Sequence, residues 1–145
     1  MEERAVSKFQ IHFTWPDTVT GEGIGFHNHM AARIFVQIDD TLYPDAAWLD
    51  NVIPMVDDWV REAMGLEDGK ESVFWFFEGP FCLKVTPQSD ALEIVERNDA
   101  FRFWVSKVAF IDEIIRCALR LRGYVDTVAI EPEYRRKSFR NIDTQ

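Results

Sequence analysis

Residues 72–105 contain four short β-strand patterns in a row, and this run constrains the fold more than any other feature of the chain. The first pattern is aromatic on both faces, which is typical of a central strand covered on one side and partly covered on the other. Turn-forming residues at 78–80, 87–90 and 98–99 separate the patterns. Short connections between successive strands predict an antiparallel meander. Its expected strands are 72–78, 81–86, 92–97 and 101–105.

Two further strands and two helices are predicted around this meander. Apolar and polar residues alternate over 9–15 and again over 33–39, which indicates half-buried strands. Apolar residues at helical spacing predict a helix over 45–64, with Asp45 as N-cap and a kink at Pro54. The alternative is a short turn over 45–51 and a main helix that starts near residue 53. Ser106 and Gly123 are suited to bound a second helix over 107–122.

The predicted order ββαββββα places strands in blocks with helices between the blocks, which is typical of the α+β class. We expect one mostly antiparallel sheet of about six strands, with both helices packed on one face. The other face would be partly exposed and would carry part of a surplus of large rings, since the chain has twelve Phe and five Trp. The 145 residues suit one domain. Residues 125–145 are expected to form a mobile tail, with an edge strand over 125–130 as the alternative.

The formal net charge of −9 is unevenly distributed along the chain. Residues 1–105 carry a net charge of −11, and residues 106–145 carry +2. An acidic surface repels nucleic acids and anionic membranes and attracts basic proteins. A basic protein partner is therefore expected, and no nucleic acid or membrane; plain solubility is the alternative explanation.

No targeting or membrane-spanning pattern is present, so a cytoplasmic location is expected. Cys82 and Cys117 are expected to be buried free thiols, and a disulfide between them is the alternative.

The histidines are the only residues whose spacing suggests a metal site. His27 and His29 are two residues apart, and a metal would need further ligands, such as His12 or a carboxylate. Two ligands are not a specific signal, so we expect no metal and no cofactor. Glycines at 21, 23 and 25 do not precede a helical pattern, which argues against a phosphate-binding loop. No nucleophile stands in a catalytic pattern, and no catalytic residue is predicted.

Acidic residues occupy the predicted polar face of the first helix. Cations are few on this face, and Asp58 and Glu62 form a like-charge pair four residues apart, which costs a helix a few tenths of a kcal/mol. A solvated helix face usually mixes its charges more evenly, although an ordinary solvated face is the alternative. The predicted partner-binding residues are those of this face and of the turn before it: Asp50, Asp57, Asp58, Glu62, Asp39 and Asp40.

Residues 74–81, with the sequence FWFFEGPF, resemble a strand–turn–strand motif of small bacterial α+β proteins that are themselves similar to toxin-immunity proteins. The resemblance extends over residues 30–122, and residues 78–80 are its most specific part. It implies binding rather than catalysis and supplies no site residues.

The leading functional hypothesis is therefore a non-catalytic immunity or inhibitor protein. It would neutralise a toxin, such as a nuclease domain, by covering the toxin's basic surface. A metal-dependent enzyme or binding module that uses the three histidines is the first alternative. A scaffold protein that associates with copies of itself through its open sheet face is the second.

Overall fold

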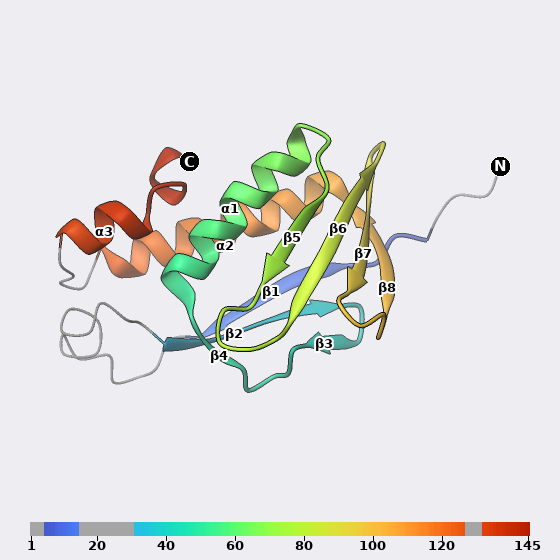
Figure 1. The fold of residues 1–145 in the computed structure, drawn as a ribbon, viewed down its shortest axis with the longest axis horizontal. Helices are drawn as coiled ribbons and strands as arrows, with labels where there is room; N and C mark the ends of the chain where they lie inside the picture. The colour runs from blue at the N-terminus through green and yellow to red at the C-terminus, as the bar shows by residue number, and fades with distance from the viewer. Residues whose placement is uncertain (1–4, 15–30, 127–131) are drawn as a thin grey trace.

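The computed structural model describes residues 5–14, 31–126 and 132–145. Its helices and strands confirm the α+β class, and Figure 1 shows α1 between β5 and α2, with α2 running behind. In chain order the elements are β1 (Phe9–Thr14), β2 (Ala31–Ile38), β3 (Thr41–Tyr43), β4 (Leu49–Asn51), α1 (Val52–Glu67), β5 (Ser72–Trp75), β6 (Cys82–Gln88), β7 (Ala91–Glu96), β8 (Arg102–Ser106), α2 (Lys107–Val125), α3 (Pro132–Ser138) and the 3-10 helix η2 (Ile142–Thr144).

The strands form two antiparallel sheets, so the prediction of one sheet with about six strands is wrong. The meander β5-β6-β7-β8 is one sheet, and the other has β2 paired with β1 on one side and with β3 and β4 on the other. A parallel bridge between Ser7 and Val105 joins the two sheets, and there the backbone N–H of Ser7 donates to the carbonyl oxygen of Trp104 at 2.7 Å. Further along β1, the N–H of Ile11 donates to Glu113 of α2 at 2.7 Å. The Glu113 side chain therefore accepts the hydrogen bond that the Ile11 N–H on the edge of β1 could otherwise donate to a neighbouring strand. Because this backbone donor is already paired, the two sheets do not continue into one another at this point.

The first helix begins later than its sequence pattern predicts. Asp45 accepts a hydrogen bond from the N–H of Ala47 at 2.8 Å and stabilises a turn instead of capping a helix. Leu49–Asn51 then pairs with β2 as β4, and α1 starts at Val52. Pro54 consequently lies in the first helical turn, where a missing N–H breaks no helical hydrogen bond. The alternative start near residue 53 is thus the better prediction. The second helix begins after Ser106, whose hydroxyl accepts from the N–H of Ala109 at 3.2 Å, as predicted.

One apolar core lies between the inner faces of both sheets and the two long helices. Large rings meet in its centre: Trp59 lies 5.3 Å from Phe76, and Phe74 lies 5.2 Å from Phe110, all in edge-to-face geometry. Such aromatic pairs contribute about 0.5–1.5 kcal/mol beyond the burial of their area. Most of the aromatic surplus is therefore used inside the protein.

The sheets are also joined by a buried polar contact. The hydroxyl of Tyr43 in β3 donates to the Glu96 carboxylate of β7 at 3.0 Å. The same carboxylate accepts from the backbone N–H groups of Asn98 and Ala100, which fixes the turn between β7 and β8. Burial, followed by the contact with Glu96, raises the pKa of Tyr43 well above its ordinary value.

The described part of the C-terminal region, residues 132–145, packs against α1 and α2. Phe139 and Ile142 are fully buried in the common core, whereas a solvated tail would expose them; the expected mobility of the tail stays a prediction. The alternative of an edge strand over residues 125–130 is wrong at its first residue, because Val125 is the last residue of α2. Residues 127–130 of this predicted strand lie outside the described residues. Phe139 and Ile142 are the two large apolar residues that pack here, and two residues are too few to form a periodic pattern that would predict this packing from the sequence.

Glu113 should give the protein an acid-sensitive contribution to stability. Burial alone would raise the pKa of its carboxyl, but hydrogen bonds from Arg116 and from the Ile11 N–H outweigh burial and hold it below the ordinary value of 4.5. The contribution is therefore fully present above pH 4.5 and is lost as pH falls through the lowered folded-state pKa. We expect Glu113→Gln to lower the free energy of unfolding by about 1 kcal/mol at neutral pH. In a plot of the urea unfolding midpoint against pH, the decrease on the acid side should be less steep for this variant than for the wild type. An acid limb identical to that of the wild type would contradict this assignment.

Candidate protein-binding surface

Asp50 does not lie on an exposed helix face. It is 1% exposed, and its carboxylate accepts hydrogen bonds from Trp48 Nε1 at 2.8 Å, Asn51 N at 2.7 Å and Glu78 N at 3.3 Å. The prediction of exposure is wrong because Asp50 belongs to β4, where its side chain points beneath the β5–β6 turn. A buried carboxylate with three donors stabilises the fold and is not available to a partner.

Asp57 is also buried, at 8% exposure, although it lies on α1 as predicted. Its carboxylate accepts from the backbone N–H groups of Asn141 and Ile142 at 2.8 and 3.0 Å, and from Asn141 Nδ2 at 2.9 Å. These three donors come from the start of η2, so Asp57 fastens the C-terminal segment to the first helix. The pattern of α1 alone cannot predict this burial, because the covering segment is more than eighty residues away.

Asp39 and Asp40 are exposed in the turn between β2 and β3, as predicted. Asp39 has a positive φ of 52° and accepts a hydrogen bond from the N–H of Lys8 at 2.9 Å. A hydrogen bond from Ser7, followed by the one from Lys8, lowers its pKa. In Figure 1 this turn is at the right-hand end of β2, whereas α1 begins at the left-hand end. The structure therefore separates these two residues from the acidic residues of the helix.

Asp58 and Glu62 are the two predicted residues that reach solvent from α1, with side-chain exposures of 21% and 25%. Strand β5 runs alongside them: Ser72 Oγ donates to the carbonyl oxygen of Glu62 at 3.0 Å, and Trp59 Nε1 donates to that of Trp75 at 2.8 Å. The chain continues from α1 to β5 through an exposed, largely acidic turn. We call this region the α1–β5 surface and define it by Asp58, Glu62, Asp68, Glu71, Trp75 and Phe77.

Two large aromatic side chains are exposed on the α1–β5 surface. Trp75 is 40% exposed and Phe77 is 44% exposed. The alternation of β5 accounts for Trp75, because Phe74 and Phe76 point into the core while Trp75 points away from it. The guanidinium of Arg97 lies 5.5 Å from the Trp75 ring centroid, a cation–π contact that steadies the indole. The sequence predicts a strand that is aromatic on both faces, and this pattern could have indicated the exposure of Trp75 and Phe77. It gives no indication that Phe77 lies near Asp58.

Arg61 moderates the negative charge of the α1–β5 surface. Its guanidinium pairs with Asp58 and approaches Glu62 at 3.5 Å. Hydrogen bonding with Asp58 is the main cause that raises the pKa of Arg61. The Arg61 side chain is 62% exposed, and ion pairs of such exposed groups contribute only about 0–1 kcal/mol. The pair of Arg61 with Asp58 therefore contributes little to the stability of the fold.

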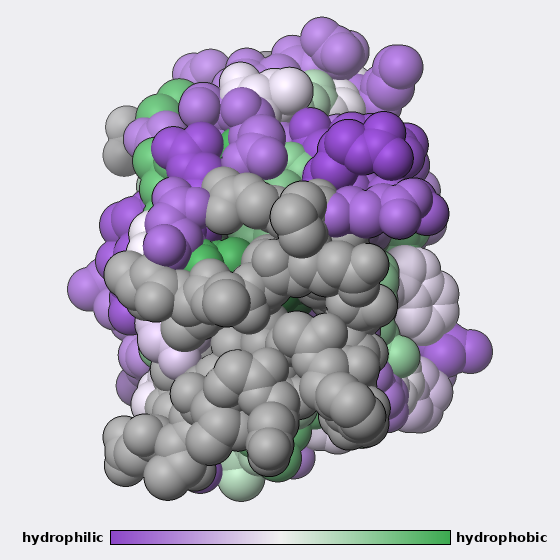
Figure 2. Space-filling model, turned by 90° about the vertical axis from the view of Figure 1, so that its left-hand side faces the viewer, coloured by the Kyte–Doolittle hydropathy of each residue, from purple (hydrophilic) through white to green (hydrophobic). Residues whose placement is uncertain are grey.

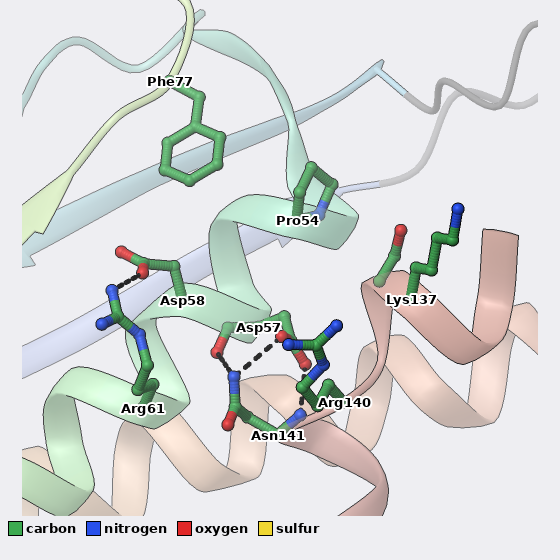
Figure 3. A pocket seen from close by; sticks show the side chains of 9 residues that line it. Pro54, Asp57, Asp58, Arg61, Phe77, Lys137, Arg140 and Asn141 are labelled. Carbon is green, nitrogen blue, oxygen red and sulfur yellow. Dashed lines mark hydrogen bonds and ion pairs between the residues drawn. The ribbon is translucent and has the colours of Figure 1, made fainter.

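A depression of about 530 Å³ adjoins one end of this surface. Figure 3 shows Phe77 and Pro54 on one side of it, Arg61 and Asp58 on another, and Lys137 and Arg140 of the C-terminal segment opposite. Figure 2 views the end of the molecule that is at the left in Figure 1, and hydrophilic side chains gather in its upper part. The sequence assigned Lys137 and Arg140 to a solvated tail, so it gave no signal for this depression.

The other groups considered for chemistry have structural partners where they are described. His12 Nε2 lies 2.7 Å from Gln37 Oε1, and its ring stacks on Phe35 at 4.8 Å. His27 and His29 lie outside the described residues, and residues 5–14, 31–126 and 132–145 hold no group of three metal-ligating side chains. Cys82 and Cys117 are free and buried. Burial raises the pKa of both thiols, that of Cys117 to about 12, so neither is a reactive thiolate at neutral pH.

The turn at residues 78–80 is held by packing. A Cβ atom added to Gly79 would lie 2.6 Å from the ring of Trp48, so only glycine fits there. The preceding Glu78 N–H donates to Asp50 at 3.3 Å. Residues 78–80 therefore dock the β5–β6 turn onto the segment around β4, which is a structural reason for this sequence.

Comparison with known proteins found no matching family model, no similar curated protein and no similar solved structure. Among the described helices, none is long and apolar enough to cross a membrane.

Proposed function

We propose that this chain is a non-catalytic binding protein that inhibits a basic protein by covering its basic surface. The observation that carries the proposal is the exposure of Phe77, which lines one depression together with Asp58 of α1, and of Trp75 two residues before it. Large exposed rings are the residues that most often dominate the affinity of protein interfaces. Charged groups around them mainly set the association rate and the choice of partner.

The proposed contact uses fewer acidic residues than the sequence suggested. Asp50 and Asp57 are excluded, because both carboxylates are buried and hydrogen-bonded within the protein. Asp58 and Glu62 remain, and Asp68 and Glu71 extend the negative surface along the turn into β5. Trp75 and Phe77 would bury their rings at the centre of the contact while the carboxylates pair with Lys and Arg of the partner. A toxin whose basic residues hold its own substrate would be neutralised by such a contact.

Affinity capture from the organism that encodes the chain tests this function. The tagged protein serves as bait in a lysate, and mass spectrometry identifies what it retains at low and at high salt. We expect one dominant partner with a basic domain, and we expect its recovery to fall as salt screens the charged contact. Trp75→Ala in the bait should reduce recovery at both salt concentrations, because its contribution is apolar. Recovery of copies of the bait alone, or of a partner without a basic surface, would contradict the proposal.

A further inference from the structure

The depression next to the α1–β5 surface has the size of a small-ligand site and combines an apolar side with cationic side chains. Its volume of about 530 Å³ lies within the range of roughly 300–1,000 Å³ that is common for such sites. Phe77 and Pro54 form an apolar side, and the rim opposite carries Lys137, Ser138 and Arg140 (Figure 3). The two sides come from parts of the chain more than fifty residues apart, and the Asp57 contacts to η2 hold them together.

The charges of this depression leave two cations available to a ligand. Both oxygens of Asp57 are occupied by donors of the C-terminal segment, and Asp58 is paired with Arg61. Arg140 has no carboxylate partner among the described residues. Lys137 lies 3.4 Å from Glu133, but that carboxylate is shared with Arg136 at 3.8 Å, and all three side chains are at least 60% exposed. Such a pair exchanges readily with another anion.

We infer that the depression binds a small ligand with a phosphate or carboxylate group attached to a flat apolar group. Lys137 and Arg140 would hold the anionic group through charge-assisted hydrogen bonds, and the Ser138 hydroxyl would donate to it. The flat group would pack against Phe77 and Pro54. Lys137, Ser138 and Arg140 lie outside the α1–β5 surface, whereas Phe77 belongs to both, so substitutions at Lys137 and Arg140 test this site separately from the proposed partner contact.

The acidic character of the whole chain does not prevent this binding. The Debye length is about 8 Å at physiological ionic strength, so distant carboxylates are largely screened at the depression. Among the charged side chains that line the depression, both carboxylates have partners within the protein, whereas Arg140 has no carboxylate partner among the described residues.

Titration with phenyl phosphate and with inorganic phosphate at constant ionic strength tests the inference. Backbone amide shifts of residues 137–141 report binding in the ¹⁵N spectrum of the intact chain. We expect saturation by phenyl phosphate with a Kd of about 1 mM or lower, and weaker binding of inorganic phosphate. Lys137→Ala with Arg140→Ala should raise the Kd for phenyl phosphate by about tenfold or more. Phe77→Ala should remove the preference for phenyl phosphate and leave the binding of inorganic phosphate unchanged.

The matched control removes two exposed lysines that do not line the depression, Lys70→Ala with Lys84→Ala. It should change the Kd by less than about twofold, because screening separates these residues from the site. Equal weakening in the two double variants would show non-specific charge attraction and overturn the inference. Absence of saturation by about 10 mM phenyl phosphate would overturn it as well, since a site with a Kd near 1 mM is almost full at that concentration.

Discussion

Asp57→Ala is expected to lower the free energy of unfolding by about 2–4 kcal/mol, since hydrogen bonds to a charged group contribute about 1.5–3 kcal/mol and several are lost together. The substitution leaves the N–H groups of Asn141 and Ile142 and the amide of Asn141 without their acceptor. Phe139 and Ile142 are then no longer held against the core, so amide exchange over residues 139–145 should accelerate more than exchange in β6 and β7. Urea unfolding and native-state hydrogen exchange measure the two effects.

Asp58→Ala is the matched control for this prediction. It removes a carboxylate from the next position of the same helix, but that carboxylate is partly exposed and pairs with an exposed arginine. Removal of such a pair costs about 0.2–1 kcal/mol. A loss at Asp57 no larger than the loss at Asp58 would mean that the C-terminal segment is not fastened through this carboxylate.

Trp59→Ala is expected to cost about 3–5 kcal/mol, the usual range when a large buried ring is truncated to alanine. Trp59 is 1% exposed and contacts Phe74 and Phe76 edge-to-face. Its Nε1 also donates to the carbonyl oxygen of Trp75, so the indole fixes β5 against α1. Chemical denaturation measures the loss, and Trp59→Phe should recover the packing part of it but not the hydrogen bond.

Trp75→Ala provides the contrast to Trp59→Ala. Trp75 lies in the adjacent strand but points to solvent, so its truncation should cost about 1 kcal/mol or less. If the two tryptophans had equal effects on stability, the inward and outward faces assigned to β5 would be wrong. If Trp75→Ala lowered stability little and partner recovery strongly, the ring would be a contact residue.

The sequence predicts elements well where their own periodicity is decisive. The meander of β5–β8 follows from short alternating segments and turn residues, and α2 follows from Ser106 and a broad apolar face. The start of α1 is left open between residue 45 and residue 53, because Trp48, Leu49 and Asp50 fit a helical spacing as well as a short strand. The pairing of Leu49–Asn51 with β2 decides between them, and that contact is not local.

The candidate site was only partly predictable for the same reason. Asp50, Asp57, Asp58 and Glu62 share an acidic pattern, but the first two are covered by the β5–β6 turn and by η2. Nothing in the pattern of one helix identifies which of its carboxylates another segment will cover. The exposure of Trp75 follows from strand alternation, whereas the packing of β5 against α1 through Trp59 and Ser72 does not.

The most direct test of the proposed function is the affinity of the captured basic partner for two charge-reversal variants. Asp58→Lys with Glu62→Lys alters the α1–β5 surface, and Asp40→Lys with Asp90→Lys makes the same change in net charge at exposed turns elsewhere. Calorimetry at physiological salt should give a Kd at least about tenfold higher for the first variant, since like charges in a contact are strongly unfavourable, and a Kd close to the wild type for the second. Equal weakening by both variants, or none by the first, would contradict a contact through the α1–β5 surface.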